Sequence, residues 1–295
     1  MKAAWRQLRH LGVQLDEQAR QGGGLQEQQE DWLLGCLHRN RKTAYGRRFG
    51  FNDIHTPDVY RKRVPLAEYD DLVLWIERTA AGEEDVLFAG RAIAFERTGG
   101  STGGSRLIPY STASLADFQT AILPWLSEII AGYNLEGSAY WAVSPALRSP
   151  QQTEGGIPIG LSDAAYLGDA AIPAFLQTLA VPQWVGTISN LHDWRLTTLY
   201  WLVRREDIEL ISVWSPTFFL SLLTGLEERA GELATIFRRG SELAGYRLDR
   251  DQAALDRLEA YLASHETERL WPKLKVVSCW GDASSRPFCS ALKKR

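Results

Sequence analysis

Cysteine and histidine are scarce in this chain, and their positions exclude two common kinds of site. Only three cysteines occur among 295 residues (Cys36, Cys279 and Cys289), which is too few and too scattered for a disulfide framework. No two of them have the spacing of metal ligands, and the five histidines show no His-x-x-x-His pattern. We therefore expect no metal site built from protein ligands, and we expect a reducing, intracellular compartment.

The chain also lacks a long apolar run and an excess of charge of one sign. Its first residues contain no apolar block of the kind that a signal peptide requires, and the uncharged stretch 210–226 is interrupted by Pro216. The formal net charge is −3, so no overall field draws the chain to nucleic acid or to an anionic membrane. The sequence therefore predicts a cytoplasmic protein with no nucleic-acid and no membrane partner.

Core-forming residues are plentiful, since 45% of the chain is hydrophobic, and their periodicity predicts an α/β fold. Ser114 with Asp117 approximates a capping box at the start of one helix, in which Pro124 predicts a kink. In the second half, strands separated by helices indicate a largely parallel sheet. Helices are expected near 2–20, 26–40, 114–129, 171–179, 193–204, 216 onward and 251–263, and strands near 85–89, 92–96, 106–110, 139–143, 208–213 and 274–279.

The most informative segment is the glycine-rich stretch 96–106, which lies between two of these strands. Glycines allow several backbone N–H groups to converge on one point, because no Cβ atom intervenes. The hydroxyl groups of Thr98, Ser101 and Thr102 add side-chain donors, and Arg106 adds a fixed positive charge. This composition is typical of an anion cradle, and we interpret it as a binding site for the phosphates of a nucleotide.

Two familiar nucleotide signatures do not fit the stretch. Gly99 and Gly104 have the spacing of the glycines in a Walker A loop, but Ser105 and Arg106 follow where that motif requires Lys and then Ser or Thr. A dinucleotide fingerprint requires Gly-x-Gly-x-x-Gly, which does not occur here. The site is therefore of neither type.

The letters TGGSTGGSR instead resemble the phosphate-binding signature of adenylate-forming enzymes, with Arg106 where Lys is usual. The flanking sequence resembles one family of that superfamily, the GH3 acyl-acid amido synthetases. This resemblance covers nearly the whole chain, and the blocks that carry it are 43–51, 64–71, 76–83, 107–109 and 270–275.

The resemblance implies a ligase that uses ATP and Mg²⁺ to convert a small-molecule carboxylic acid into an acyl-adenylate, and then transfers the acyl group to the amine of an amino acid. It implies helix-flanked sheets with a phosphate loop carried on a hairpin. Phosphate contacts are implied for Ser101, Thr102 and Gly103 and charge neutralisation for Arg106, while the loop would be shaped by Thr98, Gly99, Gly100 and Gly104. No catalytic residue is assigned.

The departures from the family pattern concern the second half of the site. The Tyr-x-Ser-Ser/Thr-Glu segment, whose Glu helps to hold Mg²⁺ in the family, and the later Asp that binds the ribose do not occur before Arg295. We also expect the family's smaller C-terminal domain to lie outside this chain. We therefore expect residues 1–295 to form a single, incomplete N-terminal adenylating domain that does not complete catalysis alone, as a truncation, the product of a split gene or a degraded reading frame.

Three points stay open from the sequence. The place of a Gly-Gly-Ala-like turn in related enzymes is occupied here by Gly281, Asp282 and Ala283. These residues either line a pocket for the nucleotide or the acyl group, or they form an ordinary strand-to-helix turn. An acyl-CoA ligase of the same superfamily would share the phosphate loop. A non-catalytic, degenerate binding domain is the third alternative.

Overall fold

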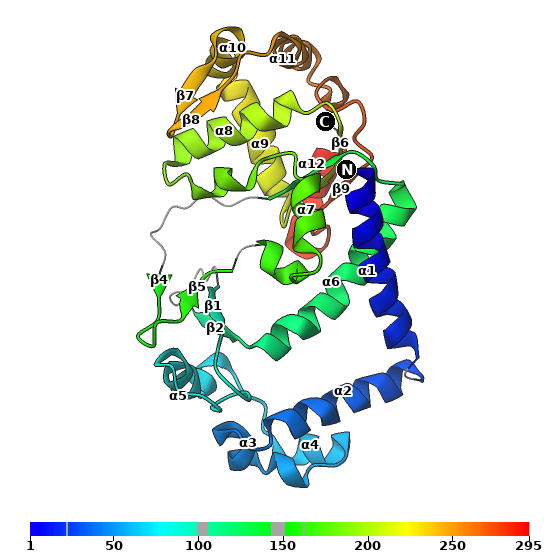
Figure 1. The fold of residues 1–295 in the computed structure, drawn as a ribbon, viewed down its shortest axis with the longest axis vertical. Helices are drawn as coiled ribbons and strands as arrows, with labels where there is room; N and C mark the ends of the chain where they lie inside the picture. Colours follow the sequence, from blue (N-terminus) through cyan, green and yellow to red (C-terminus); the bar gives the residue numbers. More distant parts are fainter. Residues whose placement is uncertain (22, 99–105, 143–150, 162, 295) are drawn as a thin grey trace. The chain divides into compact units, whose positions relative to one another are not determined.

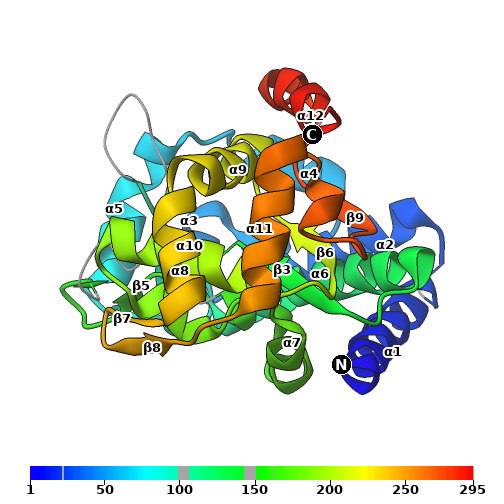
Figure 2. The ribbon, with the colours of Figure 1, turned by 90° about the horizontal axis from the view of Figure 1, so that it is seen from above.

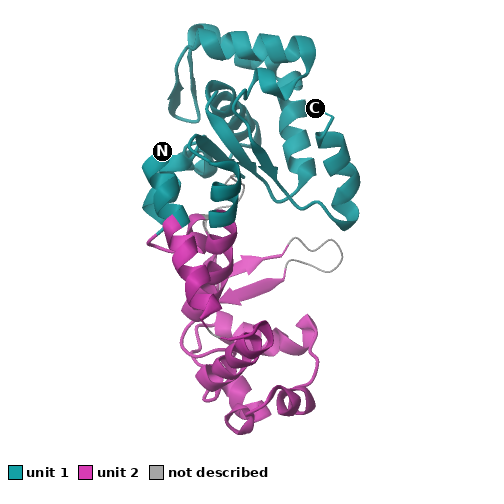
Figure 3. Cartoon of the chain, turned by 90° about the vertical axis from the view of Figure 1, so that its right-hand side faces the viewer, with its two compact units in different colours: residues 1–9, 127–149, 171–295 teal, residues 10–126, 150–170 magenta. Residues whose placement is uncertain are grey.

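The computed structural model describes residues 1–21, 23–98, 106–142, 151–161 and 163–294. They belong to two compact units, which Figure 3 colours separately. Unit 1 comprises residues 1–9, 127–149 and 171–295, and unit 2 comprises residues 10–126 and 150–170. Two long helices, α1 (Lys2–Arg20) and α6 (Thr112–Tyr133), each contribute residues to both units. The single domain expected over residues 1–295 stays a prediction.

Unit 1 is built on a parallel sheet, as the order of its elements predicts. Strand β6 (Ile208–Ser212) lies between β3 (Ser138–Trp141) and β9 (Val276–Ser278), and both pairings are parallel. The strands read as short apolar runs because helices cover the sheet, and four of the five residues of β6 are buried. The expected parallel sheet is thus confirmed.

Helices surround this sheet (Figures 1 and 2). Helices α8 (Leu191–Arg204), α10 (Ala230–Arg239) and α11 (Gln252–Ser264) pack against one another. Side chains of Asn190, Ser215 and Asp251 accept hydrogen bonds from the first turns of α8, α9 and α11, which explains where these helices begin. The other elements of the unit are α7 (Ile172–Thr178), η3 (Gln183–Thr187), α9 (Pro216–Glu228), β7 (Ser241–Leu243), β8 (Tyr246–Leu248), η4 (Thr267–Arg269), η5 (Ala283–Ser285) and α12 (Arg286–Leu292).

Unit 2 contains a second, mixed sheet in the order β2-β1-β5-β4. Its bounds are β1 (Ala94–Arg97), β2 (Leu107–Tyr110), β4 (Gln151–Gln152) and β5 (Pro158–Ile159). Helix α5 (Tyr69–Ala80) supplies Ile76 to a small core that includes Phe95 and Ile157. The remaining elements are α2 (Leu25–Asn40), α3 (Ala44–Phe49), η1 (Phe51–Asp53), α4 (Pro57–Arg63) and η2 (Asp163–Leu167).

The strand expected at 85–89 is wrong. The carbonyl groups of Asp85 and Val86 accept hydrogen bonds from Ala44 N–H (2.7 Å) and Tyr45 N–H (3.0 Å), so they satisfy the first turn of α3. Asp85 has φ 55°, and its carboxylate accepts from Gly90 N–H at 2.8 Å, which closes a turn. These backbone groups therefore have partners outside any sheet.

The cap expected for α6 is also wrong by three positions. The helix begins at Thr112, and Ser111 precedes it. The Ser111 hydroxyl accepts from Ser114 N–H (3.0 Å), and the Ser114 hydroxyl accepts from Ser111 N–H (2.8 Å). This is the reciprocal pairing of a capping box, with Ser114 in its second position in place of Asp117. The kink at Pro124 stays a prediction.

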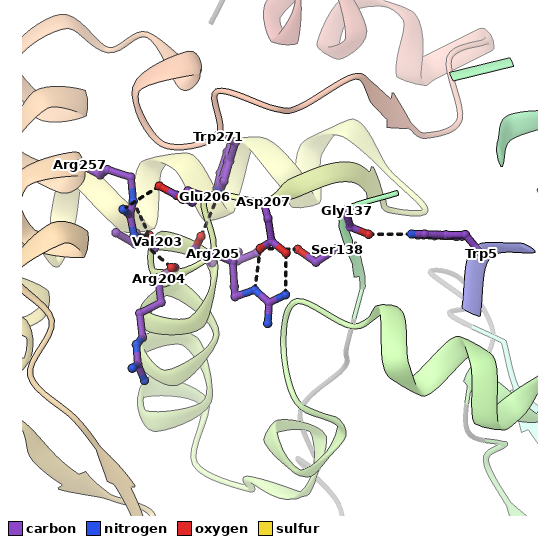
Figure 4. A network of polar contacts seen from close by, with 11 residues as sticks. Trp5, Gly137, Ser138, Val203, Arg204, Arg205, Glu206, Asp207, Arg257 and Trp271 are labelled. Carbon is purple, nitrogen blue, oxygen red and sulfur yellow. Dashed lines mark hydrogen bonds and ion pairs between the residues drawn. The ribbon is translucent and has the colours of Figure 1, made fainter. Parts of the chain in front are cut away.

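Position 137, just before β3 at the amino ends of the parallel strands, has room only for a glycine. A Cβ atom at Gly137 would lie 2.2 Å from the carbonyl oxygen of Asp207. The Gly137 carbonyl accepts the indole N–H of Trp5 at 2.7 Å, which attaches the start of α1 to this end of the sheet (Figure 4). Close by, the Asp207 carboxylate receives two hydrogen bonds from Arg205 (2.8 and 2.9 Å) and one from the Ser138 hydroxyl (3.1 Å).

The carboxyl end of α8 is satisfied by side chains from later elements, as Figure 4 also shows. Arg257 of α11 donates to the carbonyl groups of Val203 (3.2 Å) and Arg204 (3.0 Å), and the buried Trp271 indole donates to Leu202 (2.8 Å). These are carbonyl groups that a helix end leaves without internal partners. The chain therefore leaves α8 for β6 along a fixed path.

Glu209 is a buried carboxylate within the central strand, with 7% of the residue exposed. Its Oε2 atom accepts from Glu136 N–H at 2.7 Å and lies 3.1 Å from the Lys275 ammonium. Burial raises the pKa of Glu209, but hydrogen bonds from the backbone of Glu136 and Gly137 and from Lys275 outweigh burial and hold the pKa below its ordinary value. The carboxylate is thus charged and paired at neutral pH.

We expect Glu209→Gln to lower the free energy of unfolding by about 2 kcal/mol at pH 7, because the amide cannot replace the charge-assisted bonds. A lowered pKa contributes stability above the ordinary value of about 4.3 and loses it as the pH falls through the folded-state value. The difference from the unsubstituted chain should therefore shrink below about pH 4. Urea unfolding at several pH values measures it, with the exposed Glu268→Gln as the matched control. Equal stability at pH 7 would contradict this account.

Candidate functional site

The glycine-rich stretch is carried on a β-hairpin, as its sequence predicts. Strands β1 and β2 are antiparallel, and Arg97 pairs with Leu107. One step further, Thr98 N–H donates to the Arg106 carbonyl at 2.9 Å, so the ladder extends to both ends of the loop. Gly99, Gly100, Ser101, Thr102, Gly103 and Gly104 lie outside the described residues, and their part in the cradle stays a prediction.

Helix α5 fixes the returning end of the loop through Tyr69. Strand β2 lies at the edge of the sheet, where Pro109 removes no ladder bond. At the same outer edge, the Tyr69 hydroxyl accepts from Leu107 N–H (3.0 Å) and donates to the Leu107 carbonyl (3.3 Å). The Arg106 guanidinium lies over the Tyr69 ring, with its carbon 4.8 Å from the ring centroid. Contact with a ring face uses none of the guanidinium N–H donors, so it leaves them available for an anion.

On the other side of β1, Glu96 binds the segment that follows β5. Its Oε1 atom accepts a short hydrogen bond from Leu161 N–H and one from the Tyr166 hydroxyl at 3.3 Å. The Tyr166 ring also contacts Tyr110 of β2, with 5.9 Å between ring centroids, and Phe118 of α6, with 5.1 Å. One carboxylate thus joins the strand that leads into the loop to residues more than sixty positions later.

The electrostatics of this cluster keep its phenol neutral. Burial raises the pKa of Tyr166 strongly, and the charge of the Glu96 carboxylate raises it further. The phenol therefore stays protonated at neutral pH and donates its proton in the bond to Glu96. Sequence reasoning missed Glu96, Tyr110 and Tyr166, and the available signal was an acidic residue at the end of an apolar strand.

Gly281, Asp282 and Ala283 lie in unit 1, separated from the end of β9 by two residues. Ala283 has φ 50°, and the Asp282 carbonyl accepts from Ser285 N–H at 3.0 Å, so the segment is a tight turn between a strand and a helix. The turn follows the carboxyl end of a parallel strand, which is where ligands bind in open α/β sheets. The geometry fits both interpretations, and the proposed pocket role stays a prediction.

Two exposed tryptophans flank this turn. Trp214 follows β6 and Trp280 follows β9, with 59% and 66% of each residue exposed. Their ring centroids are 5.6 Å apart, the rings are nearly perpendicular, and Trp280 N–H donates to the Trp214 carbonyl at 3.2 Å. The phosphate loop belongs to unit 2 and this turn to unit 1, so each site is described by itself.

Metal ligands are not grouped in the part of the chain that the structure describes. There, no three His, Cys, Asp or Glu side chains lie close enough to hold a metal ion. Within the same ranges, no helix has the length and apolar character needed to cross a membrane.

Known proteins resemble this chain over most of its length. The family model described as "GH3 family N-terminal domain" matches residues 15–295. A probable indole-3-acetic acid-amido synthetase of Oryza sativa subsp. japonica, GH3.1, is 24% identical over 83% of this chain and 44% of its own length. The indole-3-acetic acid-amido synthetase GH3.15 of Arabidopsis thaliana is 26% identical over 84% of this chain and 45% of its own length.

Solved structures of the same kind share the fold. The structure titled "AtGH3.15 acyl acid amido synthetase in complex with 2,4-DB" aligns with a TM-score of 0.78 and 19% identity, over 96% of this chain and 52% of that one. A second structure, "GH3.15 acyl acid amido synthetase", gives a TM-score of 0.69 at 20% identity. The chain thus has this α/β fold and spans about half the length of the relatives it matches.

We expect Glu96→Ala to lower the free energy of unfolding by about 2 kcal/mol and Tyr166→Phe by about 1 kcal/mol, because the first removes both hydrogen bonds and the second only one. Together they should cost about 1 kcal/mol less than the sum, since they share one bond. Urea unfolding measures these values. The Leu161 N–H group should exchange faster with solvent in Glu96→Ala but not in Tyr166→Phe. Strict additivity would contradict the coupling, and the exposed Tyr133→Phe is the matched control.

Proposed function

Because the chain belongs to the GH3 family, we propose that it forms part of an enzyme that uses ATP to activate a small carboxylic acid as an acyl-adenylate and transfers the acyl group to an amino acid. The relatives named as amido synthetases support this reaction class. The observation that carries the proposal is the hairpin of β1 and β2, in which Thr98 N–H donates to the Arg106 carbonyl, the two residues that flank the glycine-rich loop in the sequence.

In this proposal the loop binds the phosphates of ATP. Backbone N–H groups and the hydroxyl groups of Ser101 and Thr102 donate hydrogen bonds to phosphate oxygens. The Arg106 guanidinium, which lies over the Tyr69 ring at the edge of β2, supplies a positive charge to the phosphates. A guanidinium reaches two oxygens at once where a lysine ammonium acts as a point charge, so the substitution alters the geometry and keeps the charge.

Acyl-adenylate formation makes few chemical demands on such a loop. A carboxylate oxygen attacks the α-phosphorus, and pyrophosphate leaves. The protein must hold two anions close together and stabilise the charge that develops on the phosphoryl oxygens, which directed N–H and O–H donors do. The Mg²⁺ that the family uses finds no ligand cluster among the described residues, so we derive no step through it.

We expect Arg106→Ala to weaken ATP binding by about tenfold or more, because a charge-assisted hydrogen bond to phosphate is lost. Ser101→Ala combined with Thr102→Ala should have an effect of about the same size. Isothermal titration of the chain with ATP and with pyrophosphate measures both affinities. Arg61→Ala is the matched control, since Arg61 is an exposed cation of unit 2 paired with Asp58. Undiminished ATP binding in both loop variants would refute the phosphate site.

Product analysis separates the proposed transfer from the acyl-CoA ligase alternative, which shares the loop. An active polypeptide that contains this chain should form an amide when CoA and amino acids are supplied together. If a thioester formed in place of the amide, the acyl-CoA ligase alternative would be supported. ATP binding without pyrophosphate exchange for any acid would favour the non-catalytic alternative.

A further inference from the structure

Two of the three cysteines lie side by side in unit 1. The Sγ atoms of Cys279 and Cys289 are 3.8 Å apart, although the residues belong to different elements. Cys279 directly follows β9, and Cys289 lies on α12. The third cysteine, Cys36, belongs to unit 2 and is near the Asn40 amide of its own helix (3.6 Å). Cys279 and Cys289 therefore form a pair of neighbouring thiols that does not include Cys36.

The geometry points to a modification site: we propose that Cys279 and Cys289 form a reversible intramolecular disulfide when the chain meets a peroxide. A disulfide needs two sulfur atoms that can come within bonding distance, and these two thiols are already in van der Waals contact. Both residues are partly accessible, so a small oxidant can reach them.

The oxidation is balanced by the peroxide alone. One thiolate attacks a peroxide oxygen, the O–O bond breaks, and a sulfenic acid and one hydroxide form. The second sulfur then attacks the sulfenic sulfur, the S–S bond forms, and the S–O bond breaks with loss of a second hydroxide. The two hydroxides take the two thiol protons as water. Overall the two thiols lose two electrons and two protons, and the peroxide is reduced to two waters.

The two cysteines have unequal roles in this sequence. Burial is the largest cause that raises the pKa of Cys279 to about 11, so this thiol remains protonated at neutral pH. The Cys289 sulfur lies 3.5 Å from the Trp280 carbonyl oxygen and is carried on a short helix at the surface. Because burial keeps the Cys279 thiol protonated and Cys289 lies on a helix at the surface, we assign the first oxidation to Cys289 and the resolving step to Cys279.

The disulfide would close a ring around the turn of Gly281, Asp282 and Ala283. The Cys289 sulfur already packs against this turn, since a Cβ atom at Gly281 would lie 3.8 Å from it. Joining the ends of the segment restricts the conformations of the residues between them. Any effect on nucleotide or acyl binding rests on the proposed function, whereas the disulfide itself does not.

The test treats the full chain with hydrogen peroxide and maps its tryptic peptides by mass spectrometry. Trypsin releases both cysteines in one peptide, 276–293, because Pro287 protects the bond after Arg286. We expect this peptide to lose the mass of two hydrogen atoms and to regain it with dithiothreitol. Amide exchange within 280–288 should slow in the oxidised chain. Cys36→Ser is the matched control and should behave as the unsubstituted chain does.

Single substitutions test the order of the steps. With a sulfenic-acid probe, Cys279→Ser should be labelled at Cys289 about tenfold more than Cys289→Ser is labelled at Cys279. The reverse preference would overturn the assigned order. Sulfinic acid on each cysteine without the disulfide, or a disulfide only between chains, would overturn the site. Whether the disulfide forms is tested on the unsubstituted chain, so a variant that fails to fold does not affect that result. The test does not measure ATP affinity, so it is independent of the proposed function.

Discussion

The parallel sheet of unit 1 depends on how its central strand enters it. Two carboxylates at the start of β6, Asp207 and Glu209, take hydrogen bonds from the neighbouring strand and from side chains around it. The partners of Glu209 include the backbone N–H groups of Glu136 and Gly137, which join the segment before β3 to the central strand. Gly137 is the residue that lets β3 approach this closely, because a Cβ atom there would overlap the Asp207 carbonyl. Strand β3 meets β6 at this end, and their pairing shifts by one residue between Ser138 and Ala139.

That register has its consequence at the opposite end of the sheet. Because neighbouring parallel strands run in the same direction, fixing their amino ends also sets where their carboxyl ends stop. Trp214, Trp280 and the turn at Gly281 emerge there, and the turn carries with it the helix of Cys289. The turn at Gly281 and the thiol pair of Cys279 and Cys289 are thus positioned by contacts at the opposite end of the strands. Neither the turn nor the thiol pair takes part in those contacts.

The sequence predicted several elements whose signal lies within one segment. Helices such as α1 and α11 were found because their periodicity is local. Helices α5 and α10 are amphipathic as well but were not among the expected helices. The hairpin at 241–248 was missed because its turn residues, Ala244 and Gly245, both have positive φ without the Asn-Gly or Asp-Gly pair that usually marks such a turn. The strand at 85–89 was wrong because an apolar run cannot reveal that its carbonyl groups cap a helix some forty residues earlier.

The same distinction holds for the candidate site. The loop and its place on a hairpin were predicted from contiguous letters, whereas Glu96 and Tyr166 are seventy residues apart and meet only through the fold. Cys279 and Cys289 were close enough in sequence to be noticed, but spacing alone does not bring two sulfur atoms together. Tertiary contacts of this kind have no signature in composition or periodicity.

The hairpin also solves an electrostatic problem that the sequence poses. An anion cradle that begins next to a carboxylate would repel its own ligand, and Glu96 stands two residues before Thr98. The sheet order separates the charges: Glu96 binds Leu161 beyond β5, while Arg106 lies on Tyr69 at the outer edge of β2. The carboxylate is occupied by donors on its own side and forms no ion pair with Arg106 among the described contacts. The cation therefore keeps its charge for the loop, and the acid fixes the strand from which the loop begins.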